Sequence, residues 1–305
     1  MTADTAWWHD KFAVGFESRG YFTGFSLASG SGYTLAMFST PQIEARTLAQ
    51  QALLCADVSA KCELTLTLGD ELPVDTTLVL TEPAPLPDAA GRPPAPVLVA
   101  PNELKHRSVH TEQGRAVLLH ALAHIEFNAI NLALDIVWRF ANMPEAFYRD
   151  WLKVAREEAY HFGLLQSRLA SLGRAYGDFP AHNGLWEMAA KTSGDILARL
   201  ALVPRTLEAR GLDASPAIRD KLAQAGDHDS AATLDIILRD EIGHVGIGNH
   251  WYRYICDQRG LNPIDTYDSL AKTHGAPRLR GPFNLEARRQ AGFDETELAR
   301  LQQTA

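Results

Sequence analysis

Hydrophobic residues recur every three or four positions along four long segments in the middle of the chain, as expected for helices with one buried face. The pattern predicts helices over about residues 113–140, 145–172, 185–210 and 229–258. The longest break between them, residues 173–184, fits a crossover that joins two helical hairpins. We therefore predict an all-α fold with a four-helix bundle over residues 111–260.

Weaker patterns flank this bundle. Residues 1–38 form an atypical extension, either a hairpin or disordered. Residues 39–100 form a helical lead-in and a proline-rich linker, with one helix from Thr40-Pro41 and a second near residues 60–68. Residues 261–305 are a tail that packs on the bundle, and Asp294 with Glu297 three positions later predicts a capping box for a short helix. Extra helices are therefore expected at both ends.

A proline and a glycine are predicted to distort and end the third helix. Pro204 should kink it, and Gly211 should end it. Ser215-Pro216 then suggests a cap and first-turn proline for a separate short helix.

Composition narrows the class of protein. With 305 residues and 46% hydrophobic content, the chain can bury one large core. No apolar run reaches the roughly 20 residues of a membrane helix, and the acidic start does not resemble a signal sequence, so we expect a cytoplasmic protein with no membrane partner. The formal charge of −8 disfavours a nucleic-acid partner. The three cysteines fit reduced core thiols.

A repeated octapeptide carries the candidate chemistry. Residues 156–163 and 239–246 both follow the pattern Arg-acid-Glu-x-x-His-apolar-Gly. Residues three apart share a helical face, and in both copies the Glu and the His fall within the apolar stripe. Buried carboxylates cost several kcal/mol each unless something compensates them, and a pair of metal ions would do so. Two such helices facing each other predict a dimetal site.

Two single carboxylates complete the predicted ligand set. Glu126 precedes Glu158 by 32 residues and Glu208 precedes Glu241 by 33, so the chain contains two similar hairpins. Glu187 and Asp195 are the alternatives to Glu208. The predicted metal ligands are Glu126, Glu158, His161, Glu208, Glu241 and His244.

A third match to Glu-x-x-His serves as a control. Glu103 and His106 follow a proline-rich stretch and lack a surrounding helical pattern. They are not expected to bind metal.

The ligand motifs resemble those of the ferritin-like di-iron carboxylate superfamily. More narrowly, residues 119–126, 207–213 and 240–244 resemble an uncharacterised ferritin-like bacterial family, domain-of-unknown-function family 455, and this similarity covers about residues 39–295. The resemblance implies a fold and a centre of two iron ions, with manganese possible, but no established reaction. Carboxylate and imidazole ligands suit these metals.

The resemblance also implies roles for residues beside the ligands. Asp240 would orient His161, and Glu157 would orient His244, across the bundle. Alternatively, both acids are solvent-facing charges that Arg156 and Arg239 could pair with.

Further side chains near the ligand positions carry open alternatives. His124, with His120 one turn before it, could act beside the metal as a ligand or proton carrier, or could satisfy a backbone group or face water. Tyr160 could donate an electron or proton, or could serve in packing.

Two positions depart from the superfamily pattern, and the first argues against a stable tyrosyl radical. Leu165 stands where ribonucleotide reductase small subunits have a radical tyrosine, and Leu212 where multicomponent monooxygenases have a threonine. We therefore expect a non-haem di-iron protein that uses O₂ to oxidise or hydroxylate a small organic substrate, with a possible electron donor protein. The alternatives are a ferroxidase or peroxide-scavenging protein, and a metal-free helical interaction module.

Overall fold

A computed structural model describes residues 44–81, 90–105 and 107–303. The expectations for residues 1–38 and for Thr40-Pro41 therefore fall outside the described residues. Within the described ranges the regular structure is helical, and no strand is present. The all-α prediction is confirmed.

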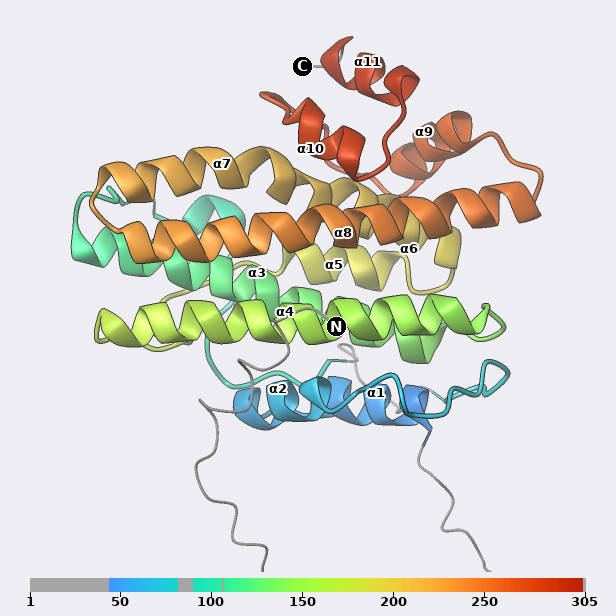
Figure 1. Cartoon of the computed structure of the whole chain (residues 1–305), viewed down its shortest axis with the longest axis horizontal. Helices are drawn as coiled ribbons and strands as arrows, with labels where there is room; N and C mark the ends of the chain where they lie inside the picture. The colour runs from blue at the N-terminus through green and yellow to red at the C-terminus, as the bar shows by residue number, and fades with distance from the viewer. Residues whose placement is uncertain (1–43, 82–89, 106, 304–305) are drawn as a thin grey trace, which may run out of the picture. The chain divides into compact units, whose positions relative to one another are not determined.

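Four helical rods lie alongside one another in the bundle (Figure 1). Three of them match the predicted helices within one or two residues, and the fourth is a composite of three consecutive segments. The rods are α3 (Glu112–Arg139), α4 (Glu145–Ser171), the composite α6 (Ile196–Leu202), η2 (Val203–Glu208) and α7 (Ala209–Gln224), and α8 (His228–Gln258). The long connection after α4 contains the short α5 (Gly184–Lys191).

The composite rod corrects the prediction for the third helix. It begins at Ile196 and continues to Gln224, so Gly211 does not end it. Residues Val203–Glu208 form a π-helix around Pro204, whose ring nitrogen has no proton to donate. The hydroxyl of Thr206 donates to the carbonyl of Ala201 at 2.7 Å, which satisfies one carbonyl in this widened turn.

Pro216 lies inside α7 rather than at the start of a new helix. A proline within a helix leaves the carbonyl four residues earlier without its usual N–H partner. That carbonyl belongs to Leu212, and the side-chain amide of Asn284 donates to it at 3.2 Å. The hydrogen bond from Asn284 therefore allows α7 to continue past Pro216, which would otherwise interrupt it.

The lead-in forms α1 (Ala45–Leu54) and α2 (Val58–Leu66), which pack against α3 and α4. The side chain of Glu44 caps the first turn of α1 by accepting from the N–H groups of Arg46 and Thr47. Buried Arg46 donates to the carbonyls of Val137 and Trp138, both at 2.9 Å. These carbonyls lie in the last turn of α3, where no backbone N–H follows to bind them, so Arg46 joins the lead-in to the end of a bundle helix.

The C-terminal segment adds α9 (Pro263–Thr273), α10 (Leu285–Gln290) and α11 (Glu295–Gln303) beside the composite rod and α8 (Figure 1). Asp294 accepts from the backbone N–H of Glu297 at 2.9 Å, and Glu297 accepts from that of Asp294 at 2.9 Å. The predicted capping box is confirmed.

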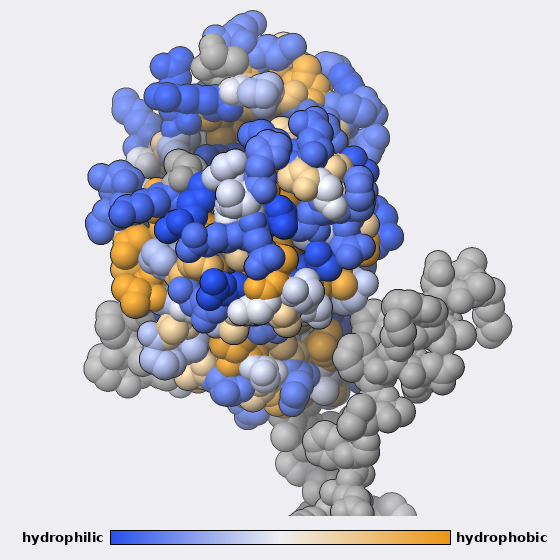
Figure 2. Space-filling model, turned by 90° about the vertical axis from the view of Figure 1, so that its left-hand side faces the viewer, coloured by the Kyte–Doolittle hydropathy of each residue, from blue (hydrophilic) through white to orange (hydrophobic). Residues whose placement is uncertain are grey.

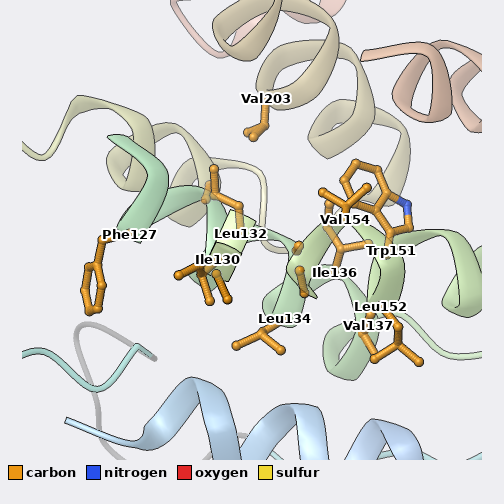
Figure 3. Close-up of a cluster of buried hydrophobic side chains, with 14 of the residues drawn as sticks. Phe127, Ile130, Leu132, Leu134, Ile136, Val137, Trp151, Leu152, Val154 and Val203 are labelled. Atoms are coloured by element: carbon orange, nitrogen blue, oxygen red, sulfur yellow. The ribbon is translucent and has the colours of Figure 1, made fainter. Parts of the chain in front are cut away.

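Apolar side chains of α3 and α4 fill the bundle, together with Val203 from η2 (Figure 3).

By length and composition α3 could cross a membrane, but 72% of its most apolar window is buried within the protein. Such burial is typical of a core helix. Hydrophilic residues predominate on the face drawn in Figure 2.

Lys61 is a buried cation in the lead-in, where its Nζ donates to the carbonyl of Leu53 and to Asn131 Oδ1, both at 2.6 Å. Burial lowers the pKa of Lys61 to about 7, whereas the unfolded chain titrates at 10.5. Between these values the unfolded state binds the additional proton, so the free energy of unfolding rises with pH.

We therefore expect the wild-type protein to gain on the order of 3 kcal/mol relative to Lys61→Met between pH 7 and pH 10. Chemical denaturation at several pH values measures this difference. Lys191→Met, at an exposed position, controls for the substitution itself. A constant difference for Lys61→Met across the range would contradict the expectation.

Candidate metal centre

Four buried residues bring potential metal-binding atoms together at the centre of the bundle. Glu126 comes from α3, Glu158 and His161 from α4, and Glu241 from α8. One ligand atom from each lies within 4.8 Å of all the others. This group could hold a metal ion. The i, i+3 spacing on α4 places Glu158 and His161 on one face, as the repeat predicted.

His161 presents its two ring nitrogens to different groups. Nδ1 faces Glu126 Oε2 at 3.5 Å and Glu158 Oε2 at 3.6 Å. Nε2 lies 3.1 Å from Asp240 Oδ2 on α8. The carboxylate of Asp240 therefore fixes the ring from outside while Nδ1 points into the cluster.

His244 repeats this arrangement from the opposite helix. Its Nδ1 lies 3.0 Å from Glu158 Oε1 and 3.4 Å from Glu241 Oε1, and its Nε2 lies 2.9 Å from Glu157 Oε2. The centroids of the His161 and His244 rings are 5.7 Å apart. Because the two oxygens of Glu158 face different imidazoles, its carboxylate can bridge two positions.

Glu208 lies in the π-helical segment and is not among the four residues whose ligand atoms fall within 4.8 Å of one another. Its carboxyl is buried at Oε2 and interacts electrostatically with Glu241, Glu158 and His244. The two alternatives lie elsewhere, since Glu187 is exposed and Asp195 caps α6 by accepting from the N–H of Leu197. Since the composite rod continues to Gln224, Glu208 lies in the interior of a helix rather than near its end.

Several buried atoms of this cluster have no hydrogen-bond partner. These atoms are Glu126 Oε2, both carboxylate oxygens of Glu158, His161 Nδ1, Glu208 Oε2 and His244 Nδ1. An unsatisfied buried polar group costs about 1–3 kcal/mol, so this concentration of them requires compensation. Oxygen and imidazole donors converging on one place fit divalent iron or manganese.

The carboxyl groups show how unfavourable the site is without a cation. Burial, together with the charge of Glu158, raises the pKa of Glu126 to about 8. Burial, followed by repulsion from Glu241 and Glu158, raises the pKa of Glu208 well above its ordinary value. At neutral pH the carboxyl of Glu126 therefore holds a proton that a metal ion would displace.

The imidazoles shift in the direction expected for cations surrounded by acids. Burial opposes the charged form of His161, but the hydrogen bond to Asp240 and the neighbouring carboxylates of Glu126 and Glu158 outweigh it and raise the pKa to about 12. Burial likewise opposes protonation of His244, while Glu158 and Glu241 raise its pKa well above the ordinary value. Without metal, the protons therefore supply the positive charge of the site.

Of the two arginines that could pair with Glu157 and Asp240, only Arg239 does so. Arg239 Nε donates to Asp240 Oδ1 at 2.8 Å. Arg156 instead donates to the carbonyl of Leu68 and to Asp70 Oδ1, and thus ties α4 to the segment after α2. Asp240 is only partly exposed, and its link to His161 excludes the alternative of a purely solvent-facing charge.

The histidines on α3 have partners other than the cluster. His124 Nδ1 lies 2.8 Å from the hydroxyl of Tyr176, and His120 Nε2 accepts from the backbone N–H of Gly177 at 2.9 Å. His120 thus satisfies a backbone group, which was one of its alternatives. Tyr160 is half-buried, with its ring centroid 6.1 Å from that of His161.

Sequence reasoning missed Tyr176. It lies in the connection after α4, which has no periodic pattern, yet its ring packs against Phe127 and Phe162 with centroids 5.4 and 5.1 Å away. Each of these phenylalanines neighbours a residue of the cluster in the sequence. A tyrosine between aromatic rings and beside a histidine gave no signal in the linear pattern.

The fold and the cluster define an all-α helical bundle with a potential metal site. Residues 54–299 match the family model described as "Protein of unknown function (DUF455)", and the chain belongs to that family. An "Uncharacterized protein" of Haemophilus influenzae is 48% identical over 260 residues, which span 82% of this chain and 90% of that protein. No solved structure matches the chain.

Proposed function

We propose that this chain is a ferritin-like dimetal protein that binds two iron ions, or iron with manganese, and uses O₂ to oxidise or hydroxylate a small organic substrate. The observation that carries the proposal is that the Nδ1 atoms of His161 and His244 both face the buried carboxylates. The Nε2 atom of each ring contacts a further carboxylate on the outer side. Two imidazoles and four carboxylates are the ligand set that helical bundles use for such pairs.

The residues divide between two positions. Glu126 and His161 would hold one ion, Glu208 and His244 would hold the other, and Glu158 and Glu241 would be shared. The bound pair supplies electrons to O₂. Asp240 and Glu157 keep the outer nitrogens protonated, so that each Nδ1 presents a lone pair to the metal.

Burial of the cluster defines the protein's own contribution. Five of the six proposed ligands have small exposed fractions, from 0% for His161 and His244 to 8% for Glu241, and Glu208 is partly buried. The apolar walls therefore keep bulk water from the ligands and strengthen their electrostatic interactions.

An external electron donor protein would complete a catalytic cycle. Cys55, Cys62 and Cys256 are free thiols, which suits the reducing cytoplasm where we place the protein.

Two other functions make different predictions. A ferroxidase or peroxide scavenger would turn over with Fe(II) or H₂O₂ alone, without an organic substrate. A metal-free interaction module would have no use for the unsatisfied buried carboxylates, which disfavours it.

Reconstitution with Fe(II) under anaerobic conditions tests the proposal. We expect about two irons per chain and an optical change when O₂ is admitted. O₂ uptake that depends on an electron donor and an organic compound supports an oxygenase, whereas uptake with Fe(II) alone supports a ferroxidase. Fewer than about one iron per chain would rule out the dimetal centre.

The contact between Asp240 and His161 provides a further prediction. Asp240→Ala removes the group that orients His161 and is expected to weaken metal binding about 10–100-fold. Asp235→Ala is the matched control, because Asp235 lies on the same helix and pairs with the partly exposed Arg219. Metal titration measures both. Equal affinities for the two variants would show that Asp240 does not support a metal ligand.

A further inference from the structure

A second candidate site lies in the C-terminal segment. A cavity of about 370 Å³ lies among α9, α11, the turn between α9 and α10, and the π-helical segment η2. Its apolar lining includes Ile264, Phe293 and Leu301. The volume is in the range of small-molecule sites in proteins, about 300–1,000 Å³.

Two buried arginines line this cavity, and both have donor atoms without partners. Arg205 is 4% exposed and pairs with Glu297, but its Nε and Nη1 make no hydrogen bond. Arg288 is fully buried and binds Asp213 through Nε and Nη2, at 3.0 and 2.6 Å, while its Nη1 has no partner. Unsatisfied donors on buried guanidinium groups are costly, and an oxyanion would satisfy them.

Aromatic rings hold the arginines in place. The guanidinium carbon of Arg205 lies 5.3 Å from the ring centroid of Tyr267 and 5.1 Å from that of Phe293. Phe293 also lies 5.2 Å from the guanidinium of Arg288, so it contacts both cations. Such contacts stabilise the positive charges and limit their movement, which prepares the donors for a ligand.

The charge around the cavity is opposite to that of the chain. Five basic residues line it against two acidic ones, Asp268 and Glu297, although the whole protein carries a formal charge of −8. Two of the basic residues are the buried arginines, and the other three, including Lys272, are exposed at the rim. The cavity therefore favours an anion that also has an apolar part.

We propose that this cavity binds an organic anion, a carboxylate or phosphate monoester on an apolar body. The oxyanion would accept from Arg205 and Arg288, and the apolar body would lie against Phe293, Ile264 and Leu301. The site goes beyond the proposed dimetal function and does not depend on it, since none of the cavity residues belongs to the metal cluster.

Calorimetric titration of the full chain with octanoate, octyl phosphate and octanol tests the proposal. We expect at least one of the two anions to bind at one site per chain, with octanol at least about tenfold weaker. The preferred anion distinguishes a carboxylate ligand from a phosphate ligand. Titrations of metal-free and reconstituted protein separate this result from the fate of the metal centre.

Two variants locate the binding site. Arg205→Lys retains a cation for Glu297 but loses the two unpartnered donors, so affinity should fall at least about tenfold. Ala271→Phe fills the cavity without removing a polar group and should abolish binding. Arg219→Lys and Ala217→Phe, both outside the cavity, are the matched controls and should bind as the wild type does.

Three results would overturn the proposal. Neither anion binds at millimolar concentration, octanol binds as tightly as both anions, or Ala271→Phe retains the wild-type affinity. Circular dichroism of each variant shows whether it is folded. If Arg205→Lys is unfolded, the comparison of Ala271→Phe with Ala217→Phe decides.

Discussion

Glu158→Gln is expected to abolish metal binding at both positions of the proposed centre. Glu158 directs one oxygen toward His161 and the other toward His244, and among the described residues no other carboxylate pairs with both imidazoles. Glutamine preserves the volume of the side chain but removes the charge that a shared ligand must supply. Iron content after reconstitution should fall from about two per chain to near zero.

Thermal and chemical denaturation provide a second measurement for Glu158→Gln. Metal at about a thousand times its dissociation constant stabilises a folded protein by about 4 kcal/mol, and the variant should lose this increment. Glu103→Gln is the control, because Glu103 belongs to the third Glu-x-x-His match but lies exposed in the short helix η1 (Pro101–Glu103). If Glu158→Gln and Glu103→Gln retain equal amounts of iron, the assignment of the ligands is wrong.

Periodicity was sufficient to predict most of the bundle, because α4 and α8 each bury one face and the apolar residues of α3 are buried on every side between Glu126 and Trp138. It failed on the composite rod. Local signals at Gly211 and Pro216 predicted an end and a new start, but both residues lie inside one helix. The carbonyl freed by Pro216 is bound by Asn284, which is distant in sequence, and such tertiary compensation leaves no trace in a local pattern.

Part of the candidate site follows from local spacing alone. Each Glu-x-x-His pair needs only the geometry of one helix, so its spacing in the sequence is already the spacing in space. The partnership of Asp240 with His161 required a resemblance to known proteins, since it crosses between helices. Tyr176 and the cavity beside Arg205 come from irregular connections and from packing of the C-terminal helices, for which sequence spacing carries no information.

The π-helical segment connects the two candidate sites without merging them. It carries Arg205, which lines the C-terminal cavity, and Glu208, which faces the bundle centre. Gly248 on α8 allows this segment to pack closely, since a Cβ at that position would lie 2.6 Å from the ring of Pro204. Glu208 is therefore held by tight packing on a local irregularity, as is common at functional sites.

Glu208→Gln is expected to change stability in opposite directions with and without metal. Burial raises the pKa of Glu208 well above 4.5, so above pH 4.5 the folded metal-free protein binds a proton that the unfolded chain releases. The wild-type protein therefore loses stability as pH rises through this window, and the glutamine variant avoids that loss. At neutral pH the metal-free variant should be more stable by about 1–3 kcal/mol, with the advantage shrinking toward pH 4.5.

Metal should reverse this order. Glu208 is proposed to hold one ion with His244, so the variant should lose most of the stabilisation that this ion provides, about 3–4 kcal/mol at saturating metal. Denaturation with and without iron at several pH values measures both differences, and Glu187→Gln, at an exposed acid, is the control. If Glu208→Gln destabilises the metal-free protein, the carboxyl has a structural role. If it stabilises the protein equally with and without iron, Glu208 is not a ligand.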